Sequence, residues 1–202
     1  HVEIYVHNSP YSAGLWGEID RLGQEFRQTL TTETLKDISG IAATRQVYRA
    51  CGKDPSRYRP AAEALIRRIL QGKQLYQINT LVDLVNLASI RYGYSIGGFD
   101  ADKFEGDTLT LGVGRAGEPY EGIGRGTINI EGLPVYRDAV GGVGTPTSDH
   151  ERTKIDDNTT HLVVLINGYD GCEADVRANA EYILQLARDY CDGTDGSYYI
   201  YK

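Results

Sequence analysis

The stretch INTLVDLVNLASIRYGYSIGGFD, residues 78–100, decides how this chain folds. Asn79 can accept hydrogen bonds from the free amides of a first helical turn. From Leu81 onward, apolar residues recur at helical spacing, which predicts a helix from residue 79 to residue 92 with one buried face. Gly93 can end this helix, because a left-handed C-cap costs glycine little.

Two polar side chains of this helix, Asp83 and Asn86, lie three residues apart and therefore share one side of it. The diglycine Gly97-Gly98 follows shortly afterwards and presents bare backbone, which another group can approach closely. Polar groups on a buried helix that faces such backbone predict a small, shaped pocket.

Hydrophobic periodicity predicts the remaining elements. The expected helices span 12–30, 32–50, 61–70 and 174–190. The expected strands span 2–6, 108–113, 127–130, 135–138, 161–166 and 197–201. Helices come first, strands dominate the middle and one helix comes late, which favours an α+β fold over a doubly wound sheet.

Composition narrows the class of protein. A hydrophobic content of 41% and a charged content of 24% are typical of a globular domain, and no apolar run approaches the length of a membrane span. The net charge of -7 argues against a protein that coats nucleic acid nonspecifically. We therefore expect neither a DNA partner nor a membrane partner.

The cysteines and histidines give a second set of exclusions. The three cysteines are odd in number and widely spaced, so we interpret them as reduced thiols in a cytoplasmic protein. The four histidines form no metal-ligand spacing. We expect no metal and no other cofactor, and the residues assign no catalytic nucleophile.

Basic residues are concentrated in residues 45–68, where seven of them stand against two acidic residues, a net charge of +5. Arginine and lysine can contact RNA phosphates, and Tyr48 and Tyr58 can stack on bases. The alternative is that these arginines pair with acidic neighbours or lie over the core with their heads in water. The candidate RNA contacts are Arg45, Arg49, Lys53, Arg57 and Arg59.

Two loops carry further candidates. The glycine-rich region 112–126 predicts tight β turns, or a flexible mouth of the pocket lined by Glu121 and Arg125. It is not a dinucleotide motif, because a strand-like segment follows instead of a helix. The loop 144–153 concentrates hydroxyls, carboxylates and an arginine, which suit an aminoacyl group or a positioned water. Its alternative is a solvated loop whose side chains bond to their own backbone.

Several motifs, taken in order, resemble the B3/4 domain of the β chain of bacterial phenylalanyl-tRNA synthetase. That domain reads approximately I-N-N-x-V-D-x-T-N-Y and then, eleven residues after the second Asn, H-A-F-D. The matches here are Ile78-Asn79, Val82-Asp83, Asn86 and, at the same distance, Phe99-Asp100. The segment 140–144 resembles the L-A-G-V-M-G-G turn of that domain. The likeness covers about residues 60–170, and the whole chain resembles free-standing members of the family.

The resemblance implies an α+β fold with a mixed β core, sandwich- or barrel-like, flanked by helices. It implies one domain over residues 1–202, with a helical N-terminal extension (1–59), a B3/4-like core (60–170) and a C-terminal helix and strand (171–202). In the synthetase this domain hydrolyses tyrosine wrongly attached to tRNA. The resemblance therefore implies tRNA or aminoacyl-tRNA as a partner, an aminoacyl-like small molecule as the ligand, and editing in trans as a possible reaction.

Three departures remove tyrosine specificity from that implication. Gly97 stands where the family has His, and Val85 where it has Thr. The apolar run 162–166 stands where the family carries a Glu that binds the tyrosine hydroxyl. A site that loses such a buried polar partner loses discrimination by a large factor. The positions that carry over as a pocket are Asn86, Gly97, Gly98, Gly141 and Gly142.

The sequence thus yields one site hypothesis and three function classes. The pocket is expected to comprise Asn79, Asp83, Asn86, Gly97, Gly98, Glu121, Arg125, Gly141, Gly142, Thr145, Thr147, Ser148, Asp149 and Arg152. The leading class is a tRNA-related, RNA-binding protein that edits mischarged tRNA. The alternatives are a binding module that kept the pocket without the chemistry, and an enzyme acting on another amino-acid-like ester or amide.

Overall fold

The computed structural model describes residues 1–201. Its helices are α1 (Ala13–Thr29), α2 (Ser39–Ala50), α3 (Ala61–Leu70), α4 (Thr80–Tyr92) and α5 (Glu173–Tyr190). Short 3-10 turns occupy η1 (Leu35–Asp37), η2 (Ala101–Lys103) and η3 (Glu151–Thr153). The strands are β1 (Val2–Tyr5), β2 (Ile96–Asp100), β3 (Thr110–Val113), β4 (Glu121–Gly122), β5 (Gly126–Thr127), β6 (Pro134–Arg137), β7 (Gly142–Gly144), β8 (His161–Ile166) and β9 (Thr194–Tyr198).

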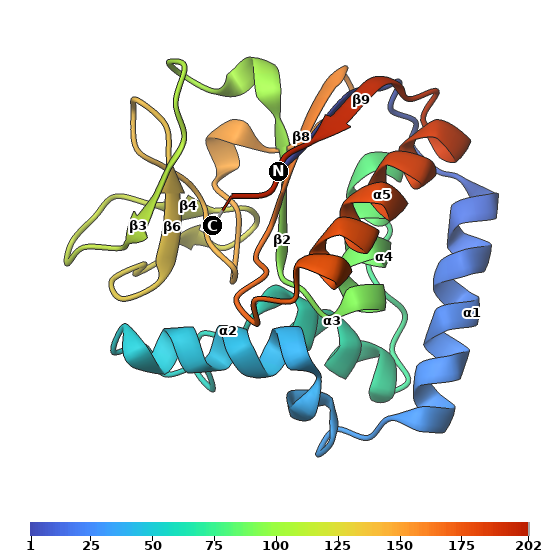
Figure 1. Cartoon of the computed structure of the whole chain (residues 1–202), viewed down its shortest axis with the longest axis horizontal. Helices are drawn as coiled ribbons and strands as arrows, with labels where there is room; N and C mark the ends of the chain where they lie inside the picture. The colour runs from blue at the N-terminus through green and yellow to red at the C-terminus, as the bar shows by residue number, and fades with distance from the viewer. Residues whose placement is uncertain (202) are drawn as a thin grey trace.

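These strands form two main sheets and a hairpin, with antiparallel pairing throughout the described ladders. Sheet A has the order β2-β8-β1-β9, and sheet B has the order β3-β6-β7. Strands β4 and β5 form the hairpin. Helices α4 and α5 cover one side of sheet A, α1 lies outside them, and sheet B faces the other side (Figure 1). The fold class expected from the sequence, α+β with a β core flanked by helices, is confirmed.

Strand β8 of sheet A carries apolar side chains on both of its faces. Leu162 and Val164 point into the large core shared with the helices. Val163 and Leu165 belong instead to a smaller core with Phe99, on the side of sheet B. Because both faces are covered, the strand is apolar along almost its whole length.

The helix predicted from residues 79 to 92 is confirmed, and so are its ends. The Asn79 side chain accepts a hydrogen bond from the amide of Val82 at 3.0 Å. Gly93 ends the helix with φ at 72°, and its amide donates to the carbonyl of Ser89. The cap and the left-handed glycine therefore fix where β2 begins.

The helix predicted over 32–50 is wrong in its first part, because α2 begins only at Ser39. The amide of Thr31 donates to the Thr34 hydroxyl at 3.0 Å, a local bond that competes with helix formation. The predicted strand over 127–130 is shorter, since only Gly126–Thr127 pairs. Conversely, both glycine segments expected as bends or bare backbone contain strands, β2 and β7.

Candidate functional site

Two glycine-bearing strands, β2 and β7, approach each other around the carboxyl group of Asp149. A Cβ atom placed on Gly97 would lie 2.6 Å from the Phe99 ring and 3.0 Å from Asp149 Oδ1. A Cβ placed on Gly144 would lie 2.5 Å from the same ring and 3.0 Å from the same oxygen. Neither position has room for a side chain, so glycine at both allows Asp149 and Phe99 to fit between the strands.

The backbone holds Asp149 in place. The amide of Gly98 donates to Asp149 Oδ2 at 3.2 Å. The backbone of Asp149 forms an isolated antiparallel β-bridge with Gly144 on β7. The amide of Ile123 donates to the Asp149 carbonyl, which ties the β4-β5 hairpin to this point. Asp149 as a residue is half-buried, although its carboxyl group is closely surrounded.

Burial changes the acidity of this carboxyl group. Desolvation raises the pKa of Asp149 to about 8, and the single hydrogen bond from Gly98 opposes that rise only in part. A carboxyl group with a pKa near neutrality can take up or release a proton at physiological pH, which is what a general base requires. Burial also raises the pKa of Asp83, a second predicted pocket residue, but Asp149 is the one held between the two glycine-bearing strands.

The hydroxyl groups next to Asp149 are bonded within the fold. Thr145 Oγ1 accepts from the amides of Thr147 and Ser148 at 3.2 and 3.1 Å, and its hydroxyl donates to the Ser148 carbonyl. Tyr48 and Thr147 share a hydrogen bond of 2.8 Å between their hydroxyls. The loop therefore contains the self-bonded turn that was the alternative interpretation of this segment.

Arg152 and Gly141 meet at another carboxylate, that of Asp138. Arg152 forms two hydrogen bonds of 2.8 Å with it, and the amide of Gly141 donates to it at 3.1 Å. Burial alone would raise the pKa of Asp138, but these bonds, with those from the amides of Glu105 and Val140, lower it to about 2. This cluster braces the turn that leads into β7.

Helix α4 packs against the opposite face of β2. A Cβ on Gly98 would lie 3.1 Å from both Val85 and Ile155, whereas Gly97 faces Phe99. Asp83 is buried and accepts from Trp16 Nε1 at 2.8 Å, and Asn79 serves as the helix cap. The structure therefore places Asn79 and Asp83 in the support of α4 and does not bring them to Asp149.

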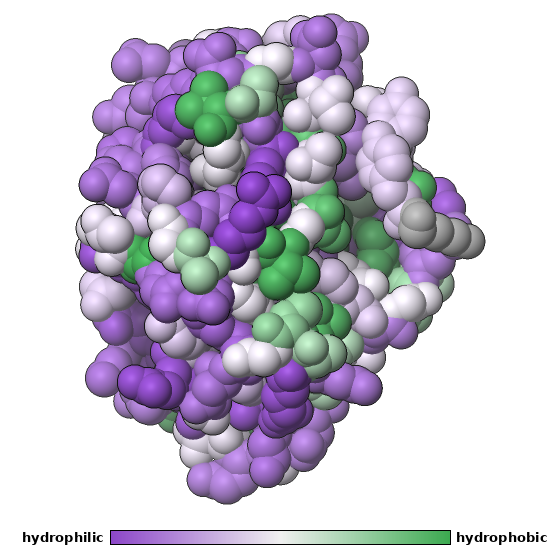
Figure 2. All heavy atoms as spheres, turned by 90° about the vertical axis from the view of Figure 1, so that its left-hand side faces the viewer, coloured by the Kyte–Doolittle hydropathy of each residue, from purple (hydrophilic) through white to green (hydrophobic). Residues whose placement is uncertain are grey.

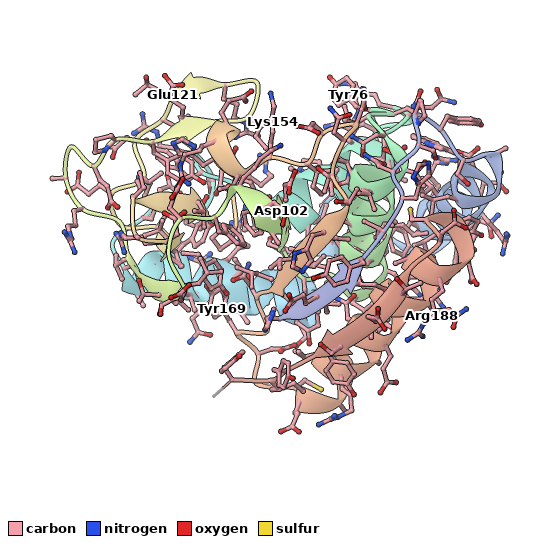
Figure 3. All side chains as sticks on the ribbon, turned by 90° about the horizontal axis from the view of Figure 1, so that it is seen from above. Tyr76, Asp102, Glu121, Lys154, Tyr169 and Arg188 are labelled. Atoms are coloured by element: carbon pink, nitrogen blue, oxygen red, sulfur yellow. The ribbon has the colours of Figure 1, made fainter. Side chains whose placement is uncertain are left out.

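The other predicted pocket residues differ in their surroundings. Asn86 is half-buried on α4, and its side chain makes no hydrogen bond within residues 1–201. Gly142 lies against the Tyr120 ring, 2.9 Å from where a Cβ would sit. Glu121 and Arg125 are exposed on the β4-β5 hairpin, and Glu121 projects at the outer edge of the molecule (Figure 3). The hairpin borders the Asp149 segment because Gly122 bridges His150.

Several of the basic candidates are paired. Arg45 contacts the buried carboxylate of Glu63 at 2.8 Å, and Arg59 lies 3.6 Å from it. Lys53 is buried, and its ammonium donates to the carbonyls of Asn129 and Glu131. Arg49 and Arg57 remain exposed and have no ion pair within residues 1–201.

A cleft of about 1360 Å³ lies apart from the predicted pocket residues. Its floor is the Val163–Leu165 face of β8, and its walls come from the 104–111 segment, Tyr136 and residues 199–201. Apolar side chains gather toward the hollowed part of this face (Figure 2). Sequence reasoning missed it because its walls come from distant segments. The one available signal was that β8 is apolar on both faces.

Two negative findings apply to residues 1–201. These residues contain no group of His, Cys, Asp and Glu side chains arranged to hold a metal ion. None of the helices they form combines the length and apolar character needed to cross a membrane.

Comparison with known proteins identifies the family. The model of the B3/4 domain matches residues 43–187, which is most of the chain. A search of curated proteins found no match. The chain therefore belongs to the B3/4 domain family, which relates it to a tRNA-related domain of the phenylalanyl-tRNA synthetase β chain.

Proposed function

We propose that this protein binds the aminoacyl end of a charged tRNA in the cytoplasm and hydrolyses the ester bond of a wrongly charged one in trans. The observation that carries the proposal is the enclosure of Asp149 between Gly97-Gly98 and Gly144. These strands contain the glycine segments by which the chain resembles the editing domain. Position 97, where the family has His, is glycine in this chain, and the Asp149 carboxyl group occupies the space next to it.

The proposed reaction needs one proton acceptor. A water molecule attacks the ester carbonyl, and the Asp149 carboxylate takes a proton from that water. The bond between the carbonyl carbon and the ribose oxygen then breaks, and the ribose oxygen takes up a proton. The products are a free amino acid and an uncharged tRNA. A positioned acid-base group of this kind contributes about 10²- to 10⁴-fold to a rate.

The proposed RNA contacts are Arg49 and Arg57. Arg49 lies near the C-terminal end of α2, and Arg57 lies in the loop that follows (Figure 1). Both side chains are exposed and free of ion pairs among the described residues, so they can bind phosphate without breaking an internal bond. Arg45 and Arg59 are proposed as weaker contacts because they already pair with Glu63. Lys53 is the weakest, because its ammonium bonds to two backbone carbonyls.

Deacylation of tRNAs charged with a panel of wrong amino acids tests the reaction. We expect hydrolysis of at least one, and Asp149→Asn should slow it by about 10²-fold or more. The matched control is Asp157→Asn, which removes an exposed carboxylate that is not part of the site. A rate that is unchanged in Asp149→Asn would remove Asp149 from the mechanism.

Binding of tRNA over a range of salt concentrations tests the RNA contact. Arg49→Ala with Arg57→Ala should weaken binding and lower the slope of log affinity against log salt by about 2. Arg177→Ala with Arg188→Ala removes the same charge from α5, where Arg188 lies far from Glu121 (Figure 3). Equal effects of the two pairs would show a general charge effect, and no binding at low salt would remove tRNA as the partner.

The second candidate is a binding module that kept the pocket without the chemistry. The observation that favours it is the internal bonding of the groups expected to hold water or an oxyanion. The amide of Gly98 bonds to Asp149, that of Gly141 bonds to Asp138, and Thr145 bonds within its own turn. Binding of charged tRNA without hydrolysis of any member of the panel would select this candidate.

A further inference from the structure

The cleft between the two sheets has the properties of a second binding site. Its volume, about 1360 Å³, exceeds the range of about 300–1,000 Å³ that holds most small-molecule ligands. The cleft lining contains none of Asp149, Gly97, Gly98 and Gly144, and the Phe99 ring beside those groups packs in a core with Val163 and Leu165. The cleft is therefore separate from the site proposed for the ester, and a ligand in the cleft does not depend on the proposed function.

The floor and walls of the cleft combine apolar and aromatic surfaces. Val163 and Leu165 form the floor, and Leu111 on β3 stands on the wall with 53% of its surface exposed. The lining also contains four tyrosines, Tyr136, Tyr169, Tyr199 and Tyr201. Such a surface binds a ligand with an apolar or aromatic body, and tyrosine faces also attract cations.

Two polar side chains of the cleft lining, Tyr136 and Asn167, are hydrogen-bonded within the fold. Tyr136 donates to Asn167 Oδ1 at 2.9 Å, and the Asn167 amide donates to the Ser95 carbonyl at 2.8 Å. This chain of bonds holds the Tyr136 ring in one position, so that wall is formed before a ligand arrives. A preformed aromatic wall lowers the entropy cost of binding.

The charged side chains around the cleft are mostly acidic. Its described lining contains three carboxylates, those of Glu3, Asp107 and Glu173, the imidazoles of His1 and His161, and no Lys or Arg side chain among residues 1–201. The one ammonium group, at the amino end of His1, donates to the Tyr199 carbonyl at 2.8 Å. Glu3 contacts His161, and Glu173 pairs with Arg177 on α5, whereas Asp107 is exposed on the loop before β3. A negatively charged, low-dielectric cleft attracts cations and repels anions.

We propose that this cleft binds a small organic cation with an aromatic or aliphatic body. The apolar body of this ligand lies on the Val163–Leu165 floor beside the tyrosines, and its ammonium group faces Asp107. Phosphorylated and carboxylated ligands are disfavoured, because the described lining offers them no Lys or Arg side chain.

Three probes that share one ring test the proposal: tyramine, which is cationic, 4-ethylphenol, which is neutral, and 4-hydroxyphenylacetate, which is anionic. Titration calorimetry should give the order cation, neutral molecule, anion, with the cation at least tenfold tighter than the anion. Amide chemical shifts measured by NMR should change in β8 and β3 and not near Asp149. Absence of binding by all three, or equal binding of cation and anion, would overturn the proposal.

Two variants on the same strand locate the effect. Leu111→Lys places a positive charge in the cleft wall and should weaken tyramine at least tenfold while it strengthens 4-hydroxyphenylacetate. Val113→Lys is the matched control, because Val113 is 49% exposed on the same strand and is not part of the cleft lining. Both positions are exposed enough to accept lysine without loss of the fold. If Val113→Lys changes the affinities as much as Leu111→Lys, the effect does not arise in the cleft.

Discussion

The carboxyl group of Asp149 fills the space beside Gly97 that a side chain at position 97 would need. The Cβ of any other residue there would lie 3.0 Å from Asp149 Oδ1 and 2.6 Å from the Phe99 ring. Glycine at 97 and aspartate at 149 are therefore compatible with each other, whereas a larger residue at 97 requires both neighbours to move.

Replacing Gly97 with Ala is expected to destabilise the protein. The added methyl group meets the Phe99 ring in a packed core, and overpacking of this kind costs about 1–3 kcal/mol. Urea unfolding measures the change. The control is Gly17→Ala on α1, where nothing lies within 4 Å and alanine should stabilise the helix by about 0.5–1 kcal/mol. A neutral Gly97→Ala would show that Asp149 and Phe99 yield without cost.

Because of Asp149, the free energy of unfolding is expected to fall as pH rises. Its pKa is about 8 in the folded protein and has an ordinary value of 3.8, so the folded state holds more protons between these values. Stability must therefore fall from pH 4 toward pH 8 and level off above it. The urea midpoint of Asp149→Asn, measured from pH 5 to pH 9, should lack this fall and exceed that of the parent protein at pH 9. Parallel curves for the two proteins would contradict the assignment.

Asp138 is expected to have the opposite pH dependence. The pKa of Asp138 is lowered from 3.8 to about 2. Its contribution to the free energy of unfolding is therefore complete above the unfolded-state pKa of 3.8 and is lost as pH falls through about 2. Asp138→Asn should cost about 1–3 kcal/mol at pH 7, because Arg152 loses its charged partner. The difference from the parent protein should shrink in acid. Asp157→Asn, at an exposed carboxylate, should cost little at either pH.

Glu63→Gln is expected to destabilise the helical side of the molecule. Glu63 is 1% exposed, and its carboxylate lies within 4 Å of Arg45, Arg59 and Arg67, so its loss leaves three arginines together without a counter-charge. A cost of about 2–3 kcal/mol is expected from the loss of charged hydrogen bonds. Thermal and urea unfolding measure it, with Glu25→Gln on the exposed face of α1 as the control. Equal stability of the two variants would show that the cluster is solvated.

The sequence predicted what is local and missed what joins distant segments. The cap at Asn79 and the glycine at 93 fixed α4, because both signals act within one turn of helix. The sequence did not predict strand β2, because Gly97-Gly98 has little strand propensity and forms a strand only by pairing with β8, far along the chain.

The same limit applies to the candidate site. The sequence singled out Gly97, Gly98 and Asp149, and the structure brings them together across 51 positions. It did not predict Gly144 or Phe99 as their neighbours, because those contacts depend on how two sheets pack. Asn79 and Asp83 have polar side chains for a structural reason, namely capping α4 and bonding Trp16. Polarity at helical spacing alone does not separate that reason from ligand binding.

The order of strands in sheet A has a consequence for biosynthesis. Strand β1 is synthesised well before both of its neighbours, β8 and β9, and 158 positions separate Glu3 from its partner His161. At about 5–20 residues per second, that interval lasts on the order of ten seconds. During that interval sheet A is incomplete, so the apolar side chains of β1 must be kept from aggregating until β8 has been synthesised.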